Sequence, residues 1–191
     1  MTGLSIGILI GVSVVAGAQL PPTSEWTRAD IETVRVSPDR YPNLPAVVRS
    51  ELNRRQCLIP QPFTATDNRL QNVAAGRFTS PSTTDWAVLC SRQRRSSILV
   101  FRGGGVAAID ELAADEDAGS LQVTSPGKIG YSRGIGVASP SFIRGHNRAA
   151  NPPLPVLDHD GINDMFIEKG SIVWYWSGAS WLKLAGADAP R

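Results

Sequence analysis

The spacing of apolar residues changes character along the chain and is helical near the beginning. Between residues 43 and 55, Pro45 falls in a first turn and the basic pair at 54–55 suits a helix C-terminus. The apolar residues of this segment recur on one helical face: Leu44, Val47, Val48 and Leu52. We therefore predict a short amphipathic helix with Asn43 as its N-cap, preceded by an extended, proline-rich lead-in over residues 19–42.

From residue 72 the pattern is typical of β-strands. Short runs with β-branched and aromatic residues are separated by turn-forming residues, and the first three are "NVAAGRF", "DWAVLCS" and "SSILVF". Three more close the chain as a predicted meander: "MFIE", "SIVWYW" and "SWLKL". The fold class we expect is mainly β (α+β): a compact antiparallel β domain over residues 43–191 with blade-like hairpins and one flanking N-terminal helix.

Two middle segments complete the predicted elements. The stretch "GGGVAAIDEL" predicts a glycine turn followed by a short helix that ends at Leu112. The stretch "KIGYSRGIGVA", residues 128–138, predicts a strand interrupted by glycines.

The first eighteen residues have the features of a signal peptide. They contain no charged side chain, are apolar from Ile6 to Val15 and end in the small residues Ala16-Gly17-Ala18. The apolar part is shorter than the ~20 residues that span a bilayer, which disfavours the alternative of an uncleaved anchor. We expect an exported protein, periplasmic or secreted, with no stable membrane span after cleavage.

Export changes the interpretation of the two cysteines. Cys57 and Cys90 are 33 positions apart, and in an oxidising compartment the simplest expectation is that they form a disulfide. No C-x-x-C motif is present for redox chemistry or zinc, and a cysteine nucleophile would have only His146 or His159 as its base.

The net charge of +2 is too small to indicate a nucleic-acid partner. Three arginines, Arg92, Arg94 and Arg95, cluster at the predicted tip of a hairpin. We interpret them as solvated, with an anion site as the alternative.

A shallow internal repeat relates two of the predicted hairpins. Placing "DWAVLCSRQRRSSILVF" over "DMFIEKGSIVWYW" aligns Asp85 with Asp164, then an apolar strand, a polar turn and a second strand. The segment "GRFTSPSTTDWAVLC", with Gly76, Phe78 and Asp85, resembles the FG-GAP or VCBS-type motif of integrin-like repeats. The later "LDHDGINDMFI" is similar to the second part of that motif, and the resemblance implies blade-like hairpins joined by acidic loops.

The chain as a whole also resembles exported bacterial proteins of unassigned function. The resemblance rests on an early "PNLP" helix, a "DWAVLC" strand and a closing "WYW…W" segment. It implies no activity.

The aspartates Asp158, Asp160 and Asp164 surround Gly161 and are candidate calcium ligands. Against the EF-hand pattern, Val156 and Ile167 fall at the first and last ligand positions, so an EF-hand is excluded. We expect no cofactor, because the preferred interpretation is an Asx-type turn that caps a strand beginning at Met165. A looser calcium loop is the alternative.

The string "GYSRG", residues 130–134, matches the G-x-S-x-G nucleophile elbow. Ser132 would be the nucleophile and His159 the base, with Asp158 or Asp160 as its partner. That motif needs a helix after the serine, and the glycines and proline that follow Ser132 oppose one.

The aromatic residues Trp174, Trp176 and Trp181 are the strongest apolar feature. Strand alternation places the first two on one face, where they either pack in the core or form a surface for a carbohydrate or protein partner.

From the sequence we expect a non-enzymatic binding or structural domain. The alternative is a small serine hydrolase that uses Ser132 and His159.

Overall fold

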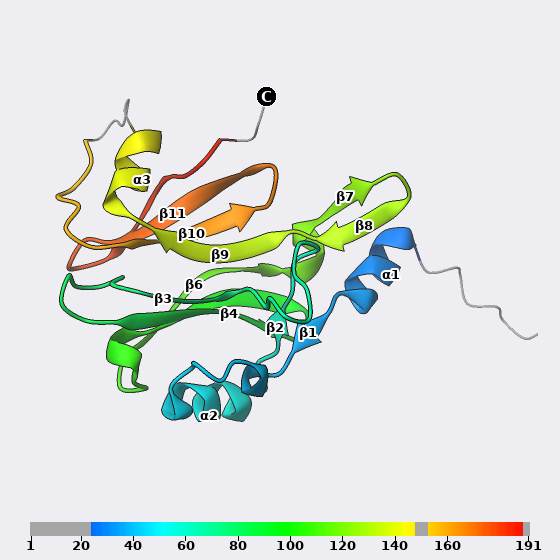
Figure 1. Cartoon of the computed structure of the whole chain (residues 1–191). Helices are drawn as coiled ribbons and strands as arrows, with labels where there is room; N and C mark the ends of the chain where they lie inside the picture. Colours follow the sequence, from blue (N-terminus) through cyan, green and yellow to red (C-terminus); the bar gives the residue numbers. More distant parts are fainter. Residues whose placement is uncertain (1–23, 148–152, 189–191) are drawn as a thin grey trace, which may run out of the picture.

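Two four-stranded antiparallel sheets stacked face to face form the centre of the molecule (Figure 1). The computed structural model describes residues 24–147 and 153–188. The first sheet contains, in spatial order, β3 (Val73–Gly76), β4 (Asp85–Arg92), β5 (Arg95–Phe101) and β6 (Ile109–Glu116). The second contains β9 (Arg133–Ala138), β10 (Gly161–Phe166), β11 (Gly170–Trp176) and β12 (Trp181–Ala185). The predicted mainly antiparallel β fold is confirmed.

Strand alternation gives the first sheet two apolar faces. The residues of β4 and β5 that face the second sheet are Ala87, Leu89, Ile98 and Val100. The residues on the other face, which pack against a helix, are Val88, Cys90, Leu99 and Phe101. All eight are fully buried. Because both faces are covered, these strands are nearly continuous apolar runs in the sequence.

Helices cover the outer faces of both sheets (Figure 1). Helix α2 (Ala46–Arg54) buries Val48 and Leu52 against the first sheet. Helix α3 (Pro140–His146) buries Ile143 against the second. The predicted flanking helix over residues 43–55 is therefore confirmed as α2, although its N-cap is Pro45 and not Asn43.

Smaller elements lie at one end of the sandwich. Helix α1 (Glu25–Glu32) contacts the hairpin of β7 (Leu121–Ser125) and β8 (Lys128–Tyr131). A second short pair joins β1 (Arg35–Val36) to β2 (Ile59–Pro60). Three 3₁₀ turns complete the description: η1 (Pro38–Arg40), η2 (Arg102–Gly104) and η3 (Asp117–Ser120).

Four predicted segments differ from the structure. The single strand predicted over residues 128–138 is divided at Ser132 into β8 and β9, which belong to different sheets. The lead-in over 19–42 contains α1, a helix whose N-terminus is capped by the Ser24 side chain, which accepts a hydrogen bond from the Thr27 backbone. The segment predicted as a helix ending at Leu112 is not α-helical: its residues 109–112 belong to β6, because pairing with β5 outweighs their helix propensity. The strand expected to begin at Met165 begins at Gly161.

A buried carboxylate connects α1 and β1 to the first sheet. Asp117, which is fully buried, accepts hydrogen bonds from Arg35 Nε at 2.9 Å and Nη2 at 2.7 Å. It also accepts from the hydroxyls of Ser91 on β4 and Ser96 on β5. Arg35 in turn binds Asp30 of α1 at 2.7 Å. The N-terminal elements are thus attached through charges, each with several partners, as burial requires.

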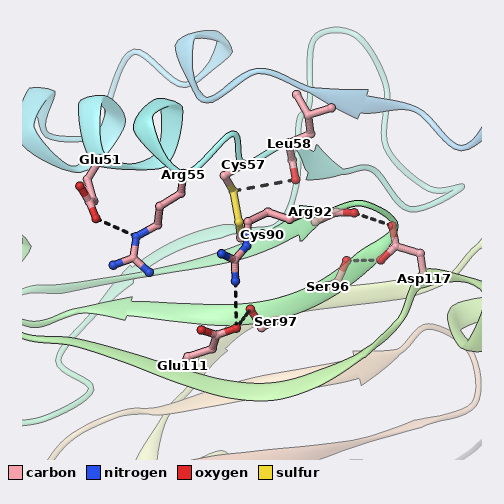
Figure 2. Close-up of a disulfide and its surroundings, with 11 residues drawn as sticks. Glu51, Arg55, Cys57, Leu58, Cys90, Arg92, Ser96, Ser97, Glu111 and Asp117 are labelled. Atoms are coloured by element: carbon pink, nitrogen blue, oxygen red, sulfur yellow. Dashed lines mark hydrogen bonds and ion pairs between the residues drawn. A yellow bond between two sulfur atoms is a disulfide. The ribbon is translucent and has the colours of Figure 1, made fainter.

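The predicted disulfide is confirmed. Cys57, just beyond the end of α2, is bonded to Cys90 on β4, with the two Cα atoms 5.3 Å apart (Figure 2). Both cysteines are buried in the cluster between α2 and the first sheet. The bond fixes the C-terminal end of the helix to the centre of that sheet.

No helix in the described parts of the chain is both long enough and apolar enough to cross a membrane. The predicted signal peptide, residues 1–18, lies outside the described residues.

Replacing both cysteines with alanine should lower the free energy of unfolding by about 3 to 4 kcal/mol, because the closed loop of 33 residues restricts the unfolded chain. Urea denaturation with and without reductant measures this loss. Wild type should lose a similar amount on reduction, whereas the variant should not respond to reductant. A variant as stable as oxidised wild type would show that the bond does not stabilise the fold.

Candidate functional site

A pocket of about 560 Å³ opens between the two sheets, where β6 lies opposite β10, β11 and β12. Ala113, Ala114 and Asp115 of β6 form one wall. Trp174 of β11, Lys183 of β12 and Lys169 of the turn after β10 line the other. The side chains of Arg133 and Asp164 are nine-tenths buried and also line the pocket. The pocket therefore combines the apolar indole of Trp174 with charged groups.

Arg133 and Asp164 form a bidentate ion pair. Arg133 Nε donates to Asp164 Oδ1 at 2.9 Å and Nη2 donates to Oδ2 at 3.0 Å, across the pairing of β9 with β10. The guanidinium also donates to the carbonyl oxygens of Ala113, at 2.9 Å, and Ser96, at 3.4 Å. Burial alone would lower the pKa of Arg133, but the hydrogen bonds and charge of Asp164 outweigh it, so this pKa lies above its usual value. The group stays charged.

The wall opposite the ion pair is an irregular strand. The register between β5 and β6 shifts between Ser96 and Ile98, and Ala113 on β6 has a positive φ of 53°. A non-glycine residue in this conformation costs free energy and persists only where the surroundings stabilise it. Here the Ala113 carbonyl accepts a hydrogen bond from Arg133, so the bulge in β6 provides an acceptor for the buried guanidinium of the pocket.

Asp164 also orients the aromatic ring. The indole Nε1 of Trp174 donates to Asp164 Oδ2 at 3.3 Å. Trp174 is half-buried and packs against the core between the sheets. A single carboxylate therefore holds both the guanidinium and the indole of the pocket.

The three candidate calcium ligands are not brought together. Asp164 binds Arg133, and Asp160 accepts from the backbone N–H of Arg77 at 3.1 Å. Asp158 is largely exposed and lies 3.8 Å from His159 Nε2. Within the described ranges, no group of three His, Cys, Asp or Glu side chains could hold a metal ion. These carboxylates therefore do not fit a shared calcium site. Nor does Asp164 open a strand, since it lies inside β10.

Ser132 and His159 have separate hydrogen-bond partners in the structure. Ser132 is fully buried between β8 and β9, and its hydroxyl donates to the carbonyl of Gly130 at 3.3 Å. The residues that follow it form β9, where a nucleophile elbow requires a helix. His159 faces the carbonyl oxygens of Asp160 at 2.9 Å and Trp176 at 3.0 Å, and its ring stacks on Tyr175. It serves to attach the 155–160 segment to β11.

The three tryptophans do not form one surface. Trp174 lines the inter-sheet pocket, whereas Trp176 lines a separate hollow beside His159. Arg102 lies 4.0 Å above the Trp176 ring, and Trp181 packs against the same ring at a tilt. Trp174 is therefore the one of these three that is placed to meet a ligand in the inter-sheet pocket.

The arginines at the tip of the β4–β5 hairpin each face a carboxylate. Arg94 pairs with Asp30, Arg95 with Glu116, and Arg92 with Glu111. Figure 2 shows the last of these beside the disulfide. This arrangement supports the interpretation of a solvated hairpin tip.

Sequence reasoning missed Arg133, Lys169 and Lys183. Arg133 lies inside the "GYSRG" string, which matched a serine-nucleophile motif. Its signal was a charged residue within a strand of glycine, isoleucine and valine, which predicts a buried charge that needs a partner. The two lysines carried no signal, because single lysines on predicted turns and strands are ordinary surface residues.

Comparison of the chain with protein-family models, with curated proteins and with solved structures found no match.

Replacing Asp164 with asparagine should lower the free energy of unfolding by about 3 kcal/mol, because Arg133 would remain buried without its counter-ion. Asp115→Asn is the matched control: it lines the same pocket but is exposed, and its effect should stay within about 0.5 kcal/mol. Urea denaturation of both variants measures the difference. Equal, small effects would contradict a structural role for the ion pair.

Proposed function

We propose that this protein is an exported, non-enzymatic binding domain whose ligand occupies the inter-sheet pocket. The observation that carries the proposal is the buried Arg133–Asp164 pair, which lines the pocket and at the same time holds the Trp174 indole at 3.3 Å. Buried charges are costly unless they are fully paired, and a buried ion pair that lines a pocket is a candidate functional group.

The composition of the pocket supports the proposed binding role. Its volume of about 560 Å³ lies within the roughly 300–1,000 Å³ of small-molecule sites, as does the volume of about 650 Å³ of another hollow beside α1 and β8. Such sites combine an apolar surface with a few fixed polar groups, as Trp174 does here with Arg133 and Asp164. The positive φ of Ala113 in the opposite wall is a further feature that recurs at binding sites.

Export is supported by the Cys57–Cys90 disulfide, because such bonds persist in oxidising compartments. The signal-peptide features of residues 1–18 point the same way. A hydrolytic role receives less support, because the Ser132 hydroxyl is buried and both ring nitrogens of His159 face backbone carbonyls.

We also infer that the chain contains two degenerate blade-like repeats of the FG-GAP type. Both aligned hairpins, β4–β5 and β10–β11, are the central pairs of four-stranded sheets whose strands follow chain order. The loops before them meet through two bonds between Arg77 and Asp160, one from each backbone N–H. Asp85 is the first residue of β4 and accepts a hydrogen bond from the backbone N–H of Thr79. In the first repeat, this aspartate therefore closes the loop that precedes the strand.

A bulky substitution in the pocket tests the proposed binding function. Ala114→Trp should fill the space, because Ala114 is exposed and lines the pocket. Ala75→Trp on β3, exposed but outside the lining, is the control. Ligand-detected NMR with a panel of neutral and acidic oligosaccharides, together with mononucleotides, should show binding to wild type and to the control, and loss in Ala114→Trp.

Both variants should melt at the wild-type temperature, so that a loss of binding reports occupancy of the pocket. Equal binding by the two variants would place the ligand elsewhere. If wild type binds no member of the panel and no nucleotide, the binding function itself is contradicted.

A further inference from the structure

Lysine is rare in this chain and is concentrated at the inter-sheet pocket. Of the 19 lysines and arginines, three are lysines: Lys128, Lys169 and Lys183. Two of them, Lys169 and Lys183, line this pocket. Both are exposed, and among the residues that the structure describes neither has a carboxylate within ion-pair distance. Their charges are thus available to a ligand.

The arginine that lines the pocket, Arg133, has a different role. Arg133 donates four hydrogen bonds, two to the carboxylate of Asp164 and two to backbone carbonyl oxygens. It is fixed inside the protein, whereas a lysine on a flexible stem can follow an anionic group that arrives from solvent. The division of roles points to an anionic group bound at the mouth, on the side of Lys169 and Lys183.

The wall on the opposite side carries the exposed carboxylate of Asp115. A carboxylate accepts hydrogen bonds from hydroxyl groups but repels phosphates and other carboxylates. A ligand that suits both walls therefore has a negative charge at one position and hydroxyl groups at another. An acidic sugar meets both requirements, because its ring carries one carboxylate and several hydroxyl groups.

Trp174 supplies the third requirement of such a ligand. Its indole is half-buried, is fixed by the bond from Nε1 to Asp164, and lines the pocket as a flat apolar surface. The C–H face of a pyranose ring is apolar while its rim carries the hydroxyls, so a sugar can pack on the indole and hydrogen-bond to the walls.

We propose that the inter-sheet pocket binds an acidic oligosaccharide containing uronic acids, with its carboxylates on Lys169 and Lys183 and one ring on Trp174. This inference rests on the proposed binding function and names its ligand class. It assigns Lys169, Lys183 and Asp115 as the groups that select an acidic sugar.

Calorimetric titration with tetragalacturonate tests the assignment, with the fully methyl-esterified tetramer as the uncharged probe. Wild type should bind the acid and bind the ester at least about tenfold more weakly, because the ester cannot form the two exposed ion pairs. Lys169→Gln/Lys183→Gln should weaken binding of the acid by a similar factor, and Lys128→Gln should not. Raising the salt concentration should weaken the binding of wild type more than that of the double variant.

The outcomes separate the ligand class from the binding function. Equal affinity for acid and ester, or an unaffected lysine double variant, would overturn the acidic-sugar assignment and leave the pocket as a binding site. Binding of adenosine monophosphate but not of the tetramer, blocked by Ala114→Trp, would replace the sugar with a nucleotide. Binding of the acid that Ala114→Trp leaves intact would overturn both the assignment and the proposed use of this pocket.

Discussion

The buried ion pair of Arg133 and Asp164 is the interaction on which both the sandwich and its pocket depend. Arg133 belongs to the second sheet, yet it donates to carbonyl oxygens of β5 and β6 in the first. Removing a guanidinium and a carboxylate from water costs several kcal/mol per ion, so the pair persists only because almost all of its hydrogen-bonding capacity is satisfied. The geometry that satisfies it fixes the spacing of the two sheets at the pocket.

A second charged centre connects to the first through one residue. The Ser96 hydroxyl donates to Asp117, while its carbonyl accepts from Arg133. Asp117 in turn holds Arg35 and, through it, Asp30 of α1. The apolar layers supply most of the driving force for folding, and these polar contacts set how the peripheral elements are oriented on them.

The sequence predicted the elements with strong periodicity and failed where tertiary contacts decide. The helix over residues 43–55, the β4–β5 hairpin, the C-terminal meander and the Cys57–Cys90 bond follow from local pattern and cysteine count. The first half of β6, up to Leu112, was predicted as a helix because "AAIDEL" favours a helix locally, and its pairing with β5 is a long-range effect. Two residues of the candidate site were identified from the sequence in other roles: Trp174 as part of an aromatic cluster and Asp164 as a candidate calcium ligand. Their convergence with Arg133 depends on the sheet register.

The central claim is that a ligand binds against the Trp174 indole that Asp164 orients. The most direct measurement is an NMR titration of ¹⁵N-labelled protein with tetragalacturonate, following the side-chain N–H signals of the five tryptophans and of Arg133 Nε. The account predicts saturable shifts of the Trp174 indole and Arg133 Nε signals, with those of Trp26 and Trp86 unchanged. Shifts confined to other tryptophans, or no shifts at saturating ligand, would contradict it.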